Sequence, residues 1–245
     1  MAKRRNSETT SFSAFFVFLA FLLLEFRYFG NSCRKPHSEE GISIMIDVHE
    51  ITQLHVDAVQ RWHQRQIDNP FSGLLEVVCR QHEQNFRLWH EEDIARSPDV
   101  SDSDLAGVKR SIDKLNQKRN DLIEQVDDCL VRDLAARGVV PWKSARLNTE
   151  TPGSVIDKLS ILALRIFHME EQVFRTDATE EHRAKVKAKL EILHEQHRDM
   201  TAALGELLED IFTGRKRLKV YRQFKMYNDP TLNPYLYNAQ KRGAA

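Results

Sequence analysis

The segment from Thr151 to Phe174 carries apolar side chains around almost its whole circumference. It reads TPGSVIDKLSILALRIFHMEEQVF, with Thr151 and Pro152 where a helix has its N-cap and its first residue. A helix that is apolar all round has to be buried among other helices. This segment therefore predicts a helical bundle with a central helix, and the rest of the chain must supply the helices that cover it.

Four other segments have apolar side chains on one face only, as helices at the outside of a bundle do. Only nine glycines and seven prolines interrupt 245 residues, which favours long helices over β-structure. We predict an all-α fold: a bundle of about five long helices over residues 45–213, followed by a basic, aromatic C-terminal arm over residues 214–245. The four outer helices are expected over residues 47–67, 74–96, 101–136 and 179–212, and either Ser101 or Ser103 can be the N-cap of the third.

The first 44 residues do not continue this pattern. MAKRR precedes an apolar run from Phe12 to Leu24, in the manner of a signal or anchor sequence. The run is shorter than the roughly 20 residues that cross a bilayer, and extending it over residues 12–29 brings in charged residues. Two interpretations follow: a membrane anchor, or a translation start at Met45. The second is favoured, because three scattered cysteines fit a reducing, cytoplasmic compartment.

Composition and motifs exclude several classes of function. A formal net charge of zero is not that of a dedicated nucleic-acid binder, so no nucleic acid is expected as a partner. The sequence contains no glycine-rich phosphate loop, no G-x-S-x-G elbow and no CxxC pair. Function must therefore be sought in side chains that the helices bring together.

Several polar side chains fall on or beside the apolar faces of the expected helices. At about 100° per residue, FRLWHEEDIAR turns Trp89 and Asp93 inward and Glu91 to solvent. The set suggests either a ligand pocket among the second, third and fourth helices or a structural network with internal ion pairs, for which Asp93–Arg96 and Asp157–Arg119 are the candidates. The candidate ligand-binding residues of the bundle are His82, Asn85, Trp89, Asp93, Asp113, Asn120, Asp157 and His168.

Two metal sites can be considered from the sequence, one for magnesium and one for zinc. Glu91-Glu92 followed by Glu124-Gln-Val-Asp127 loosely resembles the paired acidic motifs of all-α nucleoside-triphosphate pyrophosphohydrolases, although Ala95 stands where a third acid is expected. Magnesium prefers carboxylate oxygens, so the candidate ligands are Asp93, Glu124 and Asp127. A zinc site would need three inward histidines at one level of the bundle, for which the candidates are His82, His168 and His197.

The C-terminal arm, RKRLKVYRQFKMYNDPTLNPYLYN, alternates basic and aromatic residues. Arg222, Lys225 and Tyr227 are the arm's candidate contacts to a phosphate and a ring. The alternative is an arm that packs its aromatic rings on the bundle and leaves its charges in water.

Four blocks of the chain resemble the bacterial family catalogued as domain of unknown function 4254. They are HEQNFRLWHEEDIAR, KRSIDKLNQKRNDLIEQVD, TPGSVIDKLSILALRIFHMEEQ and KVYRQFKMYNDPTLNP, and the resemblance extends from about Met45 to Tyr237. It implies an all-helical, mostly cytosolic domain, encoded near cell-envelope glycosyltransferases, and it implies no known activity.

Three functions follow from these observations. The favoured one is binding of an anionic small molecule, such as a nucleotide sugar or a phosphorylated glycan precursor of cell-envelope polysaccharide metabolism. The second is a magnesium-dependent phosphohydrolase, with magnesium as the one cofactor suggested. The third is a non-catalytic interaction partner of envelope-biosynthesis glycosyltransferases.

Overall fold

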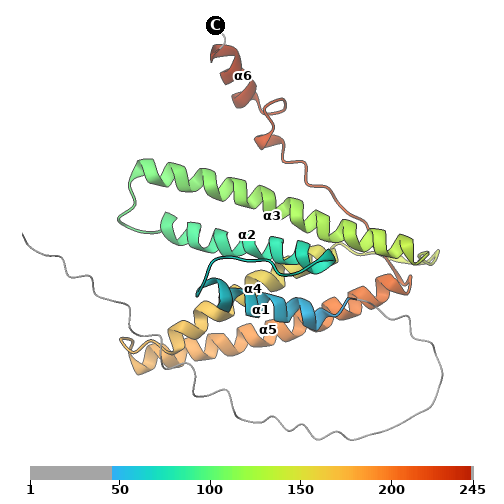
Figure 1. The fold of residues 1–245 in the computed structure, drawn as a ribbon, viewed down its shortest axis with the longest axis horizontal. Coiled ribbons are helices and arrows are strands. Elements are labelled where there is room, and N and C mark those ends of the chain that lie inside the picture. Colours follow the sequence, from blue (N-terminus) through green and yellow to red (C-terminus); the bar gives the residue numbers. More distant parts are fainter. Residues whose placement is uncertain (1–45, 244–245) are drawn as a thin grey trace, which may run out of the picture. The chain divides into compact units, whose positions relative to one another are not determined.

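The computed structural model describes residues 46–243, which form five long helices and a short sixth one (Figure 1). The predicted all-α bundle is confirmed, whereas the apolar run at residues 12–29 lies outside the described residues. The elements are α1 (Val48–Trp62), α2 (Gly73–Ala95), α3 (Asp102–Ala136), β1 (Arg146–Leu147), α4 (Pro152–Val173), α5 (Glu180–Phe212), β2 (Lys216–Arg217), the 3-10 helix η1 (Met226–Asn228) and α6 (Pro234–Gly243).

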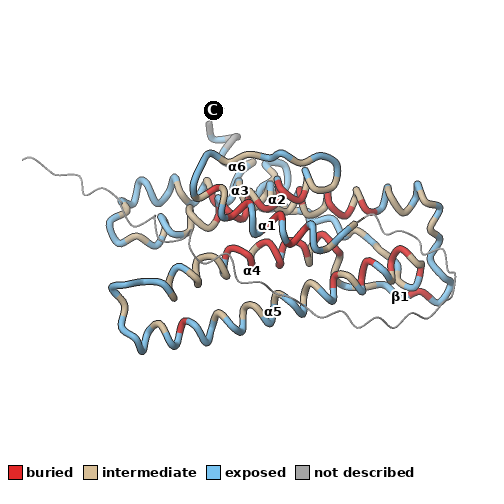
Figure 2. The backbone as a smooth tube through the Cα atoms, turned by 60° about the horizontal axis from the view of Figure 1, so that its bottom comes forward, coloured by how far each residue is buried: buried red, intermediate tan, exposed pale blue. Residues whose placement is uncertain are grey.

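Helix α4 is the central helix that its sequence predicts. It contacts each of the other four long helices, while α2 pairs with α3 and α5 pairs with α4 as two antiparallel hairpins. Figure 2 shows buried residues along α4 and along the sides of α1 and α2. Ile156, Leu159 and Leu164 are almost completely buried there, so α4 supplies the apolar surface on which its neighbours pack.

Side-chain caps begin three of the helices where the sequence predicts them. The hydroxyl groups of Ser101, Thr151 and Thr179 accept hydrogen bonds from backbone N–H groups one turn later, at 3.1, 3.2 and 3.2 Å. Each cap satisfies one of the N–H groups that a helix leaves without an internal partner.

Helix α1 ends at Trp62, five residues before the predicted end at residue 67. The cause is Asp68, whose carboxylate accepts hydrogen bonds from Arg61 Nε at 2.7 Å and from Trp62 Nε1 at 3.2 Å. These bonds draw the chain back over the end of the helix. This reversal of the chain direction depends on contacts between the helix end and the following loop. The apolar periodicity of residues 47–67 gives no sign of such contacts.

A short parallel pairing joins the start of the C-terminal arm to the loop between α3 and α4. Strands β1 and β2 pair Arg146 with Lys216 and Leu147 with Arg217. Gly214, at φ +76°, stops α5, and its carbonyl accepts a hydrogen bond from the N–H of Trp142 at 2.9 Å. The arm therefore starts from a defined position beside the loop.

Within residues 46–243, none of the helices combines the length and the apolar character that a bilayer crossing requires.

Gly153, at the start of α4, allows the backbones of α3 and α4 to approach closely. A Cβ atom at this position would lie 2.6 Å from the carbonyl oxygen of Ile123 and 2.9 Å from Asp127 Oδ1. The N–H of Gly153 also donates to Asp127 Oδ1 at 2.7 Å. The first turn of α4 is thus pinned to α3 by a contact that only glycine permits.

We expect Gly153→Ala to lower the free energy of unfolding by about 1–3 kcal/mol, because α3 and α4 have to separate to admit the methyl group. Urea-induced unfolding followed by circular dichroism measures the change. The control is Gly205→Ala on α5, where nothing lies within 4 Å of the added carbon. There the lower backbone entropy of alanine should raise stability by about 0.5–1 kcal/mol. Equal effects of the two substitutions would contradict the close approach.

Candidate functional site

Asp157 of α4 is the acceptor on which three helices converge. Arg119 of α3 donates to it twice, from Nε to Oδ1 at 2.8 Å and from Nη2 to Oδ2 at 2.5 Å. Gln81 and Asn85 of α2 also donate to Oδ1, Asn85 at 2.9 Å. The Asp157 residue is only 4% exposed, so a buried charge is compensated by a two-bond ion pair and by two amides. The predicted pairing of Asp157 with Arg119 is confirmed.

A second layer of polar contacts lies next to this ion pair. Ser160 Oγ accepts a hydrogen bond from Asn85 Nδ2 at 2.9 Å and lies 2.7 Å from His82 Nδ1. His82 and Ser160 are fully buried. The polar residues that sequence placed on the inner faces of α2 and α4 therefore do form a network, and its members come from both helices.

Buried histidine rings continue the network toward α1. The rings of His55 and His82 lie 4.7 Å apart, and Trp62 stacks on His82 at 5.2 Å. Burial lowers the pKa of His82 to about 3 and the pKa of His55 well below its usual value. Both rings are therefore neutral near pH 7, and the positive charge of this region comes from arginine.

A cavity of about 460 Å³ opens between α2, α3 and α4 beside the ion pair. We call it the central cavity. Three predicted ligand residues, Asn85, Trp89 and Asp93, line it. Its complete lining is Asn85, Leu88, Trp89, Glu92, Asp93, Arg96, Asn116, Arg119, Ile161, Leu164 and Arg165.

Trp89 forms an oriented aromatic wall of the central cavity. His168 of α4 stacks on its ring at a centroid distance of 4.6 Å and an interplanar angle of 9°. His168 Nδ1 lies 2.8 Å from Glu171 Oε2, a hydrogen bond that holds the histidine ring in place. The predicted residue His168 thus supports Trp89 from behind and does not itself line the cavity.

The arginines of the central cavity differ in how far their charge is compensated. Arg119 is paired with Asp157, and Arg96 is paired with Glu92 at 2.7 Å. Arg165 of α4 lines the cavity and makes no hydrogen bond or ion pair with any residue in the range 46–243. One uncompensated guanidinium therefore faces the cavity together with a paired one.

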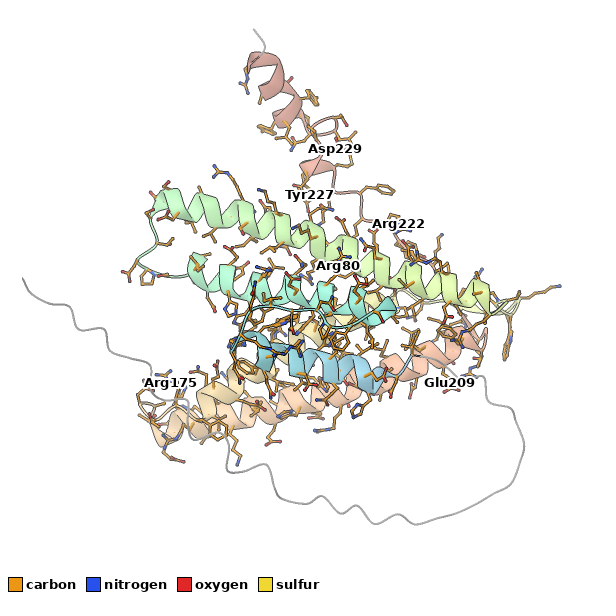
Figure 3. All side chains as sticks on the ribbon, viewed as in Figure 1. Arg80, Arg175, Glu209, Arg222, Tyr227 and Asp229 are labelled. Atoms are coloured by element: carbon orange, nitrogen blue, oxygen red, sulfur yellow. The ribbon has the colours of Figure 1, made fainter. Side chains whose placement is uncertain are left out.

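The arm reaches the same side of α3 from the C-terminal end of the bundle. Arg222 donates to Glu124 at 3.0 Å and to Asp128 at 2.7 Å, which raises its pKa (Figure 3). Lys225 Nζ donates to the carbonyl oxygen of Asn116 at 3.2 Å, and burial lowers the pKa of this lysine. Because Asn116 lines the central cavity, Lys225 lies at its rim.

Two of the carboxylates predicted as magnesium ligands, Glu124 and Asp127, accept hydrogen bonds from different parts of the chain. Glu124 accepts from Arg222 and from the N–H of Gln223, and Asp127 accepts from the N–H of Gly153. Burial raises the pKa of Asp127 to about 6. No three His, Cys, Asp or Glu side chains within the described residues are grouped to hold a metal ion. The proposed magnesium trio, and the zinc site of His82, His168 and His197, remain predictions without a supporting contact.

The remaining predicted residues lie apart from the central cavity. Asp113 is exposed and paired with Lys109, Asn120 is half-buried, and Tyr227 is 64% exposed on the arm. None of the three lines the central cavity.

The predicted division of FRLWHEEDIAR is corrected in two places. Glu91, expected in solvent, is half-buried and accepts a hydrogen bond from Ser111 Oγ of α3 at 2.7 Å. Asp93, expected to face inward, is exposed at the cavity wall, and Arg96 pairs with Glu92 in its place. The reason is that α3 packs along a side of α2 that its apolar stripe does not mark.

Sequence reasoning missed Arg165. The signal was present, because Arg165 is the one arginine in a helix that is otherwise apolar nearly all round. It also follows the cavity-lining Ile161 by four residues, which puts both on the same face of α4.

A comparison with family profiles finds one match: the family described as protein of unknown function (DUF4254), over residues 75–220. The matched region runs from the first turn of α2 to the end of α5, and it includes the whole lining of the central cavity and the start of the arm. Searches of curated proteins and of solved structures return no match.

We expect Asp157→Asn to lower the free energy of unfolding by about 3–5 kcal/mol, since it leaves the guanidinium of Arg119 without its counter-charge. Chemical denaturation measures the effect. Glu92→Gln, which breaks the exposed pair with Arg96, is the control and should change stability by about 0.5 kcal/mol or less. In the double variant with Arg119→Gln, the two losses should be clearly less than additive. Full additivity would show that the pair does not act as one unit.

We expect stability to fall as pH decreases from 6.5 toward 3, because unfolded His82 takes up a proton in that range and folded His82 does not. The expected slope from this one residue is about 1.4 kcal/mol per pH unit. Comparing His82→Gln with the unchanged chain in urea titrations between pH 6.5 and 5 isolates the contribution, since the variant should show the shallower slope. Parallel slopes would mean that His82 is protonated in the folded state.

Proposed function

The chain belongs to the family of proteins of unknown function DUF4254, and we propose that it binds a phosphorylated small molecule in the central cavity. The ligand class is that of a nucleotide sugar or a phosphorylated glycan precursor, as used in cell-envelope polysaccharide metabolism. The binding takes place in the cytoplasm, for which the free thiols of Cys79 and Cys129 are suited.

The observation that carries this proposal is the uncompensated guanidinium of Arg165 beside the paired guanidinium of Arg119. Arg119 uses Nε and Nη2 for Asp157, so its Nη1 group remains to donate. Planar guanidinium groups bind phosphate oxygens through parallel hydrogen bonds and keep their charge at every physiological pH. Lys225 adds a third cation at the rim, where its contact with Asn116 already brings it close.

The other walls of the cavity suit the rest of such a ligand. Trp89 offers a ring held in one orientation by His168, and sugar or base rings pack on surfaces of this kind. Asn85, Asn116 and Asp93 place amide and carboxylate groups around it, which suits the hydroxyl groups of a sugar. A volume of about 460 Å³ lies in the usual range of small-molecule sites.

The two alternatives draw less support from these contacts. A magnesium-dependent phosphohydrolase would have to release Glu124 from Arg222 and Asp127 from the start of α4. A non-catalytic partner of envelope glycosyltransferases would leave Arg165, an exposed residue at the wall of the cavity, without a role in that cavity. Ligand binding accounts for both the cavity and its unpaired arginine.

We expect UDP-glucose to bind the full chain and Arg165→Gln to weaken this binding about tenfold or more, because a charge-assisted hydrogen bond contributes about 1.5–3 kcal/mol. Isothermal titration calorimetry with UDP-glucose, inorganic pyrophosphate and glucose, each with and without magnesium, gives the affinities. Arg80→Gln is the matched control, since Arg80 is an exposed arginine on α2 outside the cavity (Figure 3). Unchanged affinity in Arg165→Gln, or no binding of either phosphate compound, would refute the proposal.

A further inference from the structure

The basic arm exposes large apolar side chains along its whole course. Phe224 is 84% exposed, Tyr235 83% and Tyr227 64%. Met226 and Leu232 are 56% and 50% exposed. Contiguous exposed apolar side chains of this kind mark interaction surfaces in proteins. The predicted alternative, in which the arm packs its aromatic rings on its own bundle, is therefore wrong for these residues.

The charge of the arm is opposite to that of the bundle. Residues 214–245 hold eight of the 36 Lys and Arg residues and one of the 36 Asp and Glu residues. The rest of the chain therefore holds 28 basic and 35 acidic residues, a net charge of −7 against +7 for the arm. An acidic protein surface thus attracts the arm, and the bundle of another copy is such a surface.

A second cavity, of about 330 Å³, has both acidic and apolar residues in its lining and so complements the basic, aromatic arm. We call it the acidic cavity. Asp47, Glu50 and Asp133 lie around an apolar lining to which Ile51, Leu75 and Leu130 contribute. Asp133 is paired with Arg137 at 2.9 Å, and Asp47 accepts from the N–H of His49 as the N-cap of α1. Glu50 makes no hydrogen bond or ion pair with any residue in the range that the structure describes. Apolar walls with carboxylates between them complement aromatic side chains that alternate with lysine and arginine.

The arm of the same chain runs away from this cavity. Arg222 is held at Glu124 and Asp128, and Lys225 and Asn228 are held at Asn116 and Gln117. The arm therefore runs toward the N-terminus of α3, whereas the acidic cavity lies at positions 129–133 of that helix. At 1.5 Å per residue, Asn116 and Asp133 are about 26 Å apart along α3. The residues after Lys225 therefore follow a point on α3 that is about 26 Å from the acidic cavity of the same chain.

We propose that two copies of the chain form a dimer in which the arm of each copy lies in the acidic cavity of the other. Residues 227–236 are the part of the arm that enters the partner's cavity. The exchange is reciprocal, so the two contacts are equivalent and the assembly closes as a dimer. An anionic membrane fits less well as the occupant, because it would repel the acidic bundle that carries the arm.

The first test is the association state of the full chain by sedimentation velocity. The chain should be a dimer, and the variant Phe224→Ser/Tyr227→Ser/Tyr235→Ser should raise the dimer dissociation constant about tenfold or more, equal to about 1.4 kcal/mol or more. High salt should weaken the unchanged dimer, because screening reduces the attraction between arm and bundle. Ile94→Ser/Ile192→Ser removes exposed apolar side chains from α2 and α5 and should leave the dimer intact. A monomeric chain, or association that the triple variant retains, would overturn the proposal.

A second test locates the contact. One copy carries Cys129→Ser and Tyr235→Cys, the other keeps Cys129 at the acidic cavity, and Cys33→Ser is present in both. With differently tagged copies, a short bismaleimide should link Cys129 of one chain to position 235 of the other. In a third variant, which keeps Cys129 and carries Cys33→Ser and Tyr235→Cys in the same chain, a link between positions 129 and 235 of one chain would overturn the exchange. Protection of the cysteine at position 235 by phosphatidylserine vesicles, without any link between copies, would assign the arm to a lipid surface and would also overturn it. Neither test depends on ligand binding in the central cavity.

Discussion

The ion pair between Asp157 and Arg119 determines how the three helices around the central cavity fit together. A buried carboxylate is stable only when its charge and its lone pairs are compensated. Here the compensation comes from α3 through Arg119 and from α2 through Gln81 and Asn85, while Asp157 itself is on α4. A shift of any one helix along its axis would break at least one of these bonds. The pair thereby sets the mutual register of α2, α3 and α4, which apolar packing alone would leave less sharply defined.

The same pair explains why a cavity lined by guanidinium groups persists beside the core. Arg119 reaches Asp157 with Nε and Nη2, and its guanidinium is at the same time part of the cavity lining. Arg165 then adds a charge that no described residue neutralises. The histidines farther inside contribute no charge near neutral pH, because burial lowers the pKa values of His55 and His82. The positive groups of the site are therefore arginines, whose charge varies little with pH.

The sequence predicts what depends on local pattern and misses what depends on distant contacts. Helix starts at Ser101, Thr151 and Thr179 follow from capping chemistry, and the central place of α4 follows from its apolar circumference. The early end of α1 and the inward placement of Glu91 depend on which segment packs alongside. Arg222 and Glu124 are 98 residues apart, so no periodicity in the sequence reveals that they form an ion pair. Arg222 is predicted to contact a ligand and Glu124 to bind a metal, and the two side chains instead bind each other.

That neutralisation links the arm to the central cavity. Without Arg222, Glu124 and Asp128 would carry two uncompensated charges on α3, where Glu124 follows Arg119 by five residues, about 7.5 Å along the helix axis. Their field would oppose an approaching phosphate, since like charges repel over distances of about 10 Å at moderate salt. Arg222 compensates one of these two charges, and Lys225, bound at the carbonyl oxygen of Asn116, adds a second cation. A basic arm on an acidic bundle thus places cations beside α3, which explains how a chain of zero net charge can have a locally positive surface.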